Sequence, residues 1–250
     1  MGLYFSSLKR QLVPTAIIGT IYFIALVVTM LMCNSNSLIY FKIDPYQYGS
    51  EPIDFFWGLL VTVPFSVSTF FLKKDNFLDC VALRISKQKY IQNHIIAILT
   101  MCFAMVFLVN MGSVIFSCLV ANIDPGNPQN GLSEYILGTM QAKNPILFGV
   151  IWSFHKAFVG VGICLFAQII ALYVDNLFLA LLAPYAYIIL ENYLTAIIGF
   201  PDFSLTTAIV LNRLQPNAMR VWKIAISMGV FVLVMYIVHK KLRNDYEEKS

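Results

Sequence analysis

Glu191 is the ionisable residue whose position bears most directly on chemistry, because it lies inside the apolar segment 177–198. An ionised carboxylate in the middle of a bilayer costs about 2.5–3.5 kcal/mol, so it normally faces protein or water. Lys156, at the start of the apolar segment 157–174, is placed to neutralise it. Three interpretations stay open: Glu191 lines a pathway through the membrane, forms a structural ion pair with Lys156, or extends to water at the outer surface.

The sequence lacks the short motifs that carry common catalytic chemistry. It has no Gly-Lys dipeptide, so the phosphate-binding loop G-x-x-x-x-G-K-[ST] is absent, and H-E-x-x-H and G-x-S-x-G are absent as well. The histidines His94, His155 and His239 are far apart in the chain. We therefore expect no enzymatic activity, no metal site and no cofactor bound by this chain.

The composition is that of a protein dissolved in lipid. The 250 residues are 59% hydrophobic and 12% charged, with a mean hydropathy of +0.74, whereas soluble domains are about 25% charged. The basic residues lie in short segments and at the two ends, so nucleic-acid binding is not expected. The five cysteines are odd in number and form no C-x-x-C pair, so we interpret them as small core residues.

Long apolar runs predict six membrane-spanning helices, because about 20 apolar residues are needed to cross a hydrocarbon core of about 30 Å. We therefore predict an all-α integral membrane protein with a single transmembrane domain over residues 1–250. The expected spans are 14–33, 55–72, 95–120, 157–174, 177–198 and 224–239.

The distribution of lysine and arginine predicts the orientation, since basic residues are enriched in cytoplasmic segments. Placing both termini in the cytoplasm puts eleven basic residues inside and six outside. The segment 240–250 is then a cytoplasmic tail. Those inside are Lys9, Arg10, Lys73, Lys74, Arg84, Lys87, Lys89, Lys240, Lys241, Arg243 and Lys249, and those outside are Lys42, Lys143, Lys156, Arg213, Arg220 and Lys223.

The outer segments between the spans differ in character. Residues 34–54 are predicted to form a polar loop. The stretches 145–155 and 203–214 are apolar but too short to cross a membrane. We expect them to form short helices that lie at the outer interface or re-enter the membrane from it.

The N-terminal segment 1–13 has the pattern of a helix lying in the headgroup layer. On a helical wheel its apolar side chains gather on one side and its basic and hydroxyl side chains on the other, which suits an amphipathic interface helix. The alternative is a frayed tail before the first span. The apolar side holds Tyr4, Phe5, Leu8 and Leu12, and the polar side holds Ser6, Ser7, Lys9 and Arg10.

The loop 73–93 contains a second short amphipathic segment. Asp75 or Asn76 can cap a helix there by accepting a backbone N–H bond. Phe77, Leu78, Val81 and Ala82 then follow at helical spacing on one face. An apolar face on a cytoplasmic loop is suited to docking on another protein; the alternative is a helix resting on lipid.

The layout of these segments resembles the membrane subunit of a type-2 ATP-binding-cassette exporter. The stretches that carry the resemblance are 4–12, 75–84, the basic run 84–90 and the stretch 176–184. Such subunits have an interface helix, six spans with both ends inside, a coupling helix between the second and third spans, and outer re-entrant helices before the sixth. Many relatives have a Glu and a Gly early in the coupling loop, where this chain has Asp75 and Asp79.

The resemblance implies the partners and the site. An ATP-binding-cassette ATPase subunit would hold ATP and Mg, and a second permease subunit, identical or homologous, would complete the transporter in a bacterial plasma membrane. The residues that would couple to the ATPase are Asp75, Asn76, Phe77, Leu78, Asp79, Val81 and Arg84.

The cargo and two other functions stay open. The apolar and aromatic spans favour a hydrophobic or amphipathic cargo, such as an antimicrobial peptide, a lipid or a drug. One alternative is an ion-coupled secondary transporter, for which Glu191 is the main support. The other is a non-transporting membrane scaffold or immunity protein, which would have no ATPase partner.

Overall fold

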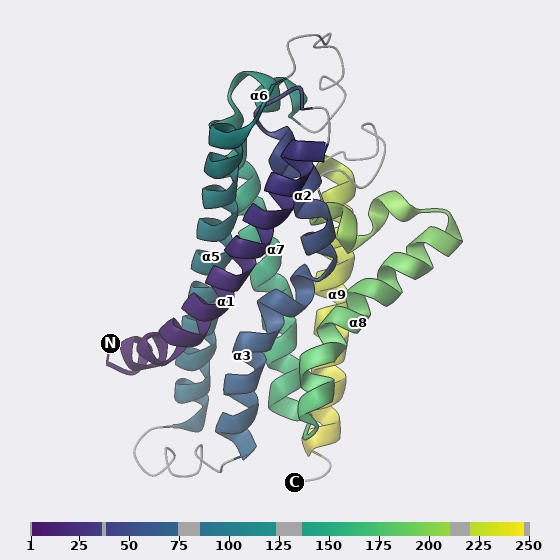
Figure 1. The fold of residues 1–250 in the computed structure, drawn as a ribbon. Helices are drawn as coiled ribbons and strands as arrows, with labels where there is room; N and C mark the ends of the chain where they lie inside the picture. The colour runs from purple at the N-terminus through teal and green to yellow at the C-terminus, as the bar shows by residue number, and fades with distance from the viewer. Residues whose placement is uncertain (1, 37–38, 75–85, 124–136, 211–220, 248–250) are drawn as a thin grey trace.

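A computed structural model describes residues 2–36, 39–74, 86–123, 137–210 and 221–247, and every regular element in these ranges is a helix. The helices form an elongated bundle (Figure 1). The elements are α1 (Gly2–Asn36), α2 (Asp44–Phe55), α3 (Trp57–Lys74), α5 (Lys87–Val120), α6 (Gly138–Lys143), α7 (Pro145–Tyr173), α8 (Leu177–Ile198), the 3₁₀ turns η2 (Pro201–Phe203) and η3 (Leu205–Ala208), and α9 (Val221–Glu247).

Five of the described helices, α1, α5, α7, α8 and α9, are long and apolar enough to cross a membrane. A sixth span is obtained if α2 and α3, which meet at an angle of 53°, are counted as one broken segment. Each of the six predicted spans overlaps one of these helices. The all-helical fold with five or six candidate spans is thereby confirmed.

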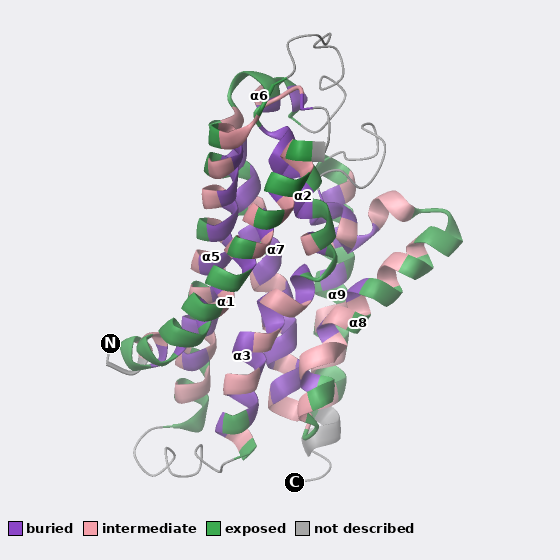
Figure 2. Ribbon diagram, viewed as in Figure 1, coloured by how far each residue is buried: buried purple, intermediate pink, exposed green. Residues whose placement is uncertain are grey.

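Helix α7 lies at the centre of the bundle. It packs against α5 and α3, while α5 packs in turn against α1. Figure 2 shows that the buried residues concentrate along the middle of the bundle. On α1 the exposed face carries Ile17, Ile21, Ile24 and Val28, at spacings of three and four residues. An apolar exposed face of this kind is expected where a helix contacts lipid rather than water.

Two predictions about the outer segments are wrong. Residues 145–155 do not form a separate short helix, because α7 runs without interruption from Pro145 to Tyr173. Within residues 34–54, α1 continues to Asn36, and 44–55 form the helix α2, which packs on α1. Pro45 does not prevent this helix, because it lies in the first turn, where the missing N–H costs little.

Three other predictions keep their status as predictions. Residues 2–13 are helical and continuous with the first span, since α1 contains Pro14 without a break; their position in the headgroup layer stays a prediction. The inward face of this segment is polar, with Ser7 and Gln11 buried. The coupling residues Asp75, Asn76, Phe77, Leu78, Asp79, Val81 and Arg84 lie outside the described residues, and α9 extends into the predicted tail as far as Glu247.

Two glycines allow the helices to approach closely. A Cβ atom on Gly49 of α2 would lie 2.8 Å from the backbone N and Cα of Met30 in α1. A Cβ atom on Gly149 of α7 would lie 2.5 Å from Cγ1 of Val114 in α5. The first contact is with backbone atoms, which cannot move away. The second is with the Val114 side chain, and a smaller residue in place of Val114 would relieve it.

These contacts predict different responses to the same substitution. Gly49→Ala and Gly149→Ala should each destabilise the protein by about 1–3 kcal/mol through overpacking. Val114→Ala should offset part of the cost of Gly149→Ala and none of the cost of Gly49→Ala. Thermal unfolding in detergent measures all of these. Gly229→Ala in α9 is the control, because a Cβ atom there meets nothing within 4 Å; an equal loss in that variant would refute the packing argument.

Candidate functional site

The bundle contains an ion pair with no access to solvent. Nζ of Lys156 lies 2.6 Å from Oδ1 and 2.7 Å from Oδ2 of Asp54, and both side chains are 0% exposed. Lys156 comes from the interior of α7 and Asp54 from the last turn of α2. An unpaired charge buried in this way would be prohibitively costly, so each of these two groups depends on the other.

The ion pair sits beside the break between α2 and α3. Phe56 separates the two helices, and its N–H still donates to the carbonyl oxygen of Ile53. The pair therefore fastens the end of α2 to α7 at the point where the chain changes direction by 53°.

Polar aromatic side chains continue the buried polar region toward α1 and α5. The Lys156 ammonium lies 5.8 Å from the centroid of the Tyr46 ring, within the range of a cation–π contact. The Tyr46 hydroxyl donates to Oδ1 of Asn110 at 2.8 Å, and the Tyr22 hydroxyl approaches the same atom at 3.4 Å. Asn110 in turn donates to the carbonyl oxygen of Val106. This chain of contacts joins α1, α2, α5 and α7.

A second polar cluster lies near the opposite end of α3. The Thr69 hydroxyl donates to Oε1 of Gln168 in α7 and lies 3.4 Å from Nε2 of His94 in α5. One turn further along α3, Lys73 forms an ion pair of 2.7 Å with Asp175, which follows α7. Polar contacts therefore hold α3 to α5 and α7 close to the basic ends of the helices.

The predicted pair between Glu191 and Lys156 is wrong. Glu191 of α8 accepts hydrogen bonds from the Ser204 hydroxyl at 2.8 Å and from the Leu205 N–H at 3.1 and 3.2 Å. The prediction failed because α7 is longer than the expected span and begins at Pro145. Lys156 therefore lies well inside this helix, where it is buried and bonds to Asp54, and not at the outer end of a span. Glu191 instead holds the start of η3 against α8.

The sequence analysis did not predict that Asp54 is a partner of Lys156, because it placed Asp54 in a loop. A signal was nevertheless present: Asp44, Gln47, Ser50 and Asp54 are all buried and follow one another at spacings of three and four residues. Such spacing marks one face of a helix. Here that face is polar and turned inward, the reverse of the pattern in a water-soluble helix.

No group of three or more His, Cys, Asp or Glu side chains that could hold a metal ion occurs among the described residues. What the site can do is hold charge in a fixed place and tie four helices together.

Comparisons with known protein families, with curated proteins and with solved structures gave no match to this chain. Its family is therefore not shown by similarity, and its function has to be argued from the layout and the chemistry of its own residues.

Removing one partner of the ion pair should be far more harmful than removing both. Lys156→Met leaves the Asp54 carboxylate buried and unpaired, which costs about 3–5 kcal/mol, whereas an apolar pair of similar volume is often neutral or better. We therefore expect Asp54→Leu combined with Lys156→Met to regain most of the thermal stability. Lys73→Met, which breaks the exposed pair with Asp175, is the control and should change little. A double variant as unstable as Lys156→Met would contradict the assignment.

Glu191 should act independently of Lys156. Glu191→Gln weakens the contacts to Ser204 and Leu205, whereas Lys156→Met breaks the contact to Asp54. The changes in the free energy of unfolding should therefore add within about 0.5 kcal/mol. The effects of Glu191→Gln and Ser204→Ala on stability, in contrast, should be non-additive, because these two side chains bond to each other. If the effects of Glu191→Gln and Lys156→Met are instead non-additive, the two residues interact and the pair of Glu191 and Lys156 that the structure rejects would be supported.

Proposed function

We propose that this chain is the permease subunit of an ATP-binding-cassette exporter, which moves a hydrophobic or amphipathic cargo with energy from a separate ATPase subunit. The observation that carries the proposal is the arrangement of the helix ends. The end of α3, the start of α5, the turn between α7 and α8, and the end of α9 all lie at one end of the bundle (Figure 1). The ion pair between Lys73 and Asp175 supports this grouping.

This end has the length and charge expected of a docking surface for an ATPase. Helix α5 has 34 residues, which corresponds to about 51 Å at about 1.5 Å per residue, while a bilayer with its headgroups is about 40–45 Å thick. The helix therefore extends beyond the membrane. Lys73 and Lys74 end α3, and Lys87 and Lys89 begin α5. Cytoplasmic segments are rich in such residues, which supports a cytoplasmic position for this end.

The contacts around α3 provide a route by which an ATPase would act on the membrane domain. A force on the segment between Lys74 and Lys87 reaches α3 and α5 directly. Thr69 bonds to Gln168 and lies close to His94, so α3 is held to both α7 and α5. ATP binding and hydrolysis in the partner would then displace these helices together, with no nucleotide chemistry in this chain.

The opposite end supports the proposal through its short helical pieces. The turns η2 and η3 lie between α8 and α9 and pack against both. Lys223 of α9 pairs with Asp202 of η2, and Glu191 of α8 holds Ser204. This is the position at which the exporter family has its outer re-entrant helices.

One observation favours a second function, an ion-coupled transporter. The pair of Asp54 and Lys156 is fully buried in a protein whose helices can span a membrane. Ionisable residues in that setting commonly belong to ion or proton pathways. Transport that stops when the proton gradient is collapsed, with ATP still present, would support this alternative over the ATPase-driven one.

The proposal predicts a stoichiometric ATPase partner that docks on residues 75–84. Phe77→Asp combined with Leu78→Asp places charge on the predicted apolar face and should reduce co-purification of an ATP-binding-cassette protein from native membranes about tenfold or more. The partner is identified by peptide sequencing through its phosphate-binding loop. Retention of the partner by this variant would show that the docking segment is misplaced.

Ile123→Asp is the matched control for this experiment. Ile123 is 45% exposed just beyond the other end of α5, so one negative charge, half of what the test variant adds, is placed at a site away from the proposed docking end. Normal co-purification with this variant shows that a new aspartate alone does not release the partner. If the unaltered chain brings down no such ATPase, the proposed function is wrong.

A further inference from the structure

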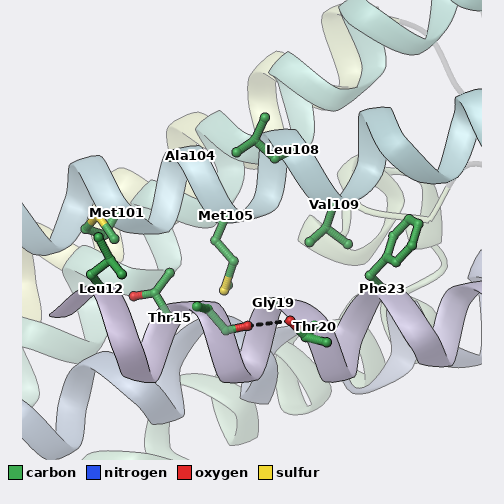
Figure 3. A pocket seen from close by; sticks show the side chains of 11 residues that line it. Leu12, Thr15, Gly19, Thr20, Phe23, Met101, Ala104, Met105, Leu108 and Val109 are labelled. Atoms are coloured by element: carbon green, nitrogen blue, oxygen red, sulfur yellow. Dashed lines mark hydrogen bonds between the residues drawn. The ribbon is translucent and has the colours of Figure 1, made fainter.

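An apolar groove runs along the outside of the bundle between α1 and α5. It has a volume of about 410 Å³, and Figure 3 shows the side chains that line it. Gly19 is in its floor, where Cγ of Met105 would come within 3.2 Å of an added Cβ atom. The side chains that line it are Leu12, Thr15, Ala16, Gly19, Thr20, Phe23, Met101, Ala104, Met105, Leu108 and Val109.

The side chains that line the groove offer no free hydrogen-bond donor to an occupant. Its two polar side chains, Thr15 and Thr20, donate their hydroxyls to the carbonyl oxygens of Gln11 and Ala16, one turn earlier in the same helix. Figure 3 shows the second of these bonds. A polar solute would lose its hydration here without compensation, so the groove selects an apolar occupant.

The length of the groove matches one leaflet of a bilayer. Along α1 it extends from Leu12 to Phe23, a rise of about 16 Å. Half of the hydrocarbon core is about 15 Å. Both helices pass the criteria for membrane spans, and the exposed Leu108 and Leu12 form part of the lining. The groove is therefore placed to hold one acyl chain lying parallel to the helices.

A cation lies just beyond one end of the groove. Lys9 precedes Leu12 by three residues, about 4.5 Å along the helix, and it continues the stripe formed by Leu12, Ala16 and Thr20. Its side chain is exposed, and no described residue forms a hydrogen bond or ion pair with it. A lipid whose acyl chain lies in the groove would have its headgroup at the level of Lys9.

From the apolar lining, the one-leaflet length and the lysine at its end, we infer that the groove between α1 and α5 is a binding site for an anionic phospholipid. One acyl chain lies along Gly19 and Ala104, and the phosphate-bearing headgroup contacts Lys9. The site does not depend on the proposed transport function, since it uses neither the docking loop nor the buried ion pair.

The test measures lipid retained by the full-length protein in detergent, by native mass spectrometry after titration with dioleoyl phosphatidylglycerol or dioleoyl phosphatidylcholine. A lysine at a membrane surface is worth about 1 kcal/mol toward an anionic lipid, so we expect about fivefold preference for phosphatidylglycerol. Lys9→Gln should abolish the preference but keep chain binding. Ala104→Trp fills the groove and should reduce retention of both lipids severalfold.

Matched controls separate the groove from the general lipid-facing surface. Ile17→Trp adds the same side chain at a 55% exposed position of α1 outside the groove and should leave retention unchanged. Lys240→Gln removes a lysine elsewhere and should leave the preference unchanged. If Ala104→Trp fails to fold, Ala16→Phe fills the groove from the opposite wall. Undiminished retention by the filled variant, or equal retention of the two lipids by the unaltered chain, would overturn the inference.

Discussion

The desolvated pair of Asp54 and Lys156 is the constraint on which the arrangement of the bundle depends. Neither charge is stable unpaired in an interior without water. The end of α2, which carries Asp54, therefore has to lie beside Lys156 of α7. Tyr46 covers the ammonium and bonds to Asn110, which brings α5 into the same contact. Away from this point, further polar contacts hold α3 to α7 and α8 to η3, and the rest of the interior is apolar packing, which has little directional preference.

Apolar packing between membrane helices favours small residues, because lipid competes equally well for large apolar side chains. Two close approaches in this bundle follow that rule, with Gly49 against Met30 and Gly149 against Val114. The polar contacts therefore decide which helices meet, and the glycines decide how near they come. This division explains how a bundle with so few charged residues has a defined interior.

The spans could be predicted from the sequence, and the ion pair could not. Hydropathy is a local property, so 95–120 or 177–198 can be recognised as spans without knowing their neighbours. The partner of Lys156 depends on two longer-range facts: α7 begins at Pro145, and α2 is a helix. Pro45, Gly49 and Pro52 argue locally for a loop, yet Gly49 is required by the contact with Met30. Gly49 thus argues locally against a helix and is also needed for the packing of α2. Glu191 was recognised as notable, but its partner Ser204 lies in a short turn without a sequence signature.

The position of the ion pair next to the break at Phe56 has a mechanical consequence. Asp54 is two residues from the break, about 3 Å along the axis, whereas Asp44 at the start of α2 is about 18 Å from it. Each 10° of rotation of α2 about that break would carry Asp44 through about 3 Å and Asp54 through only about 0.5 Å. The pair thus anchors the end of α2 that lies beside the break, and any rotation of α2 about Phe56 would have to break the contacts at its far end, where the Tyr46 N–H donates to the Ser117 hydroxyl and the Gln47 amide donates to Gln141.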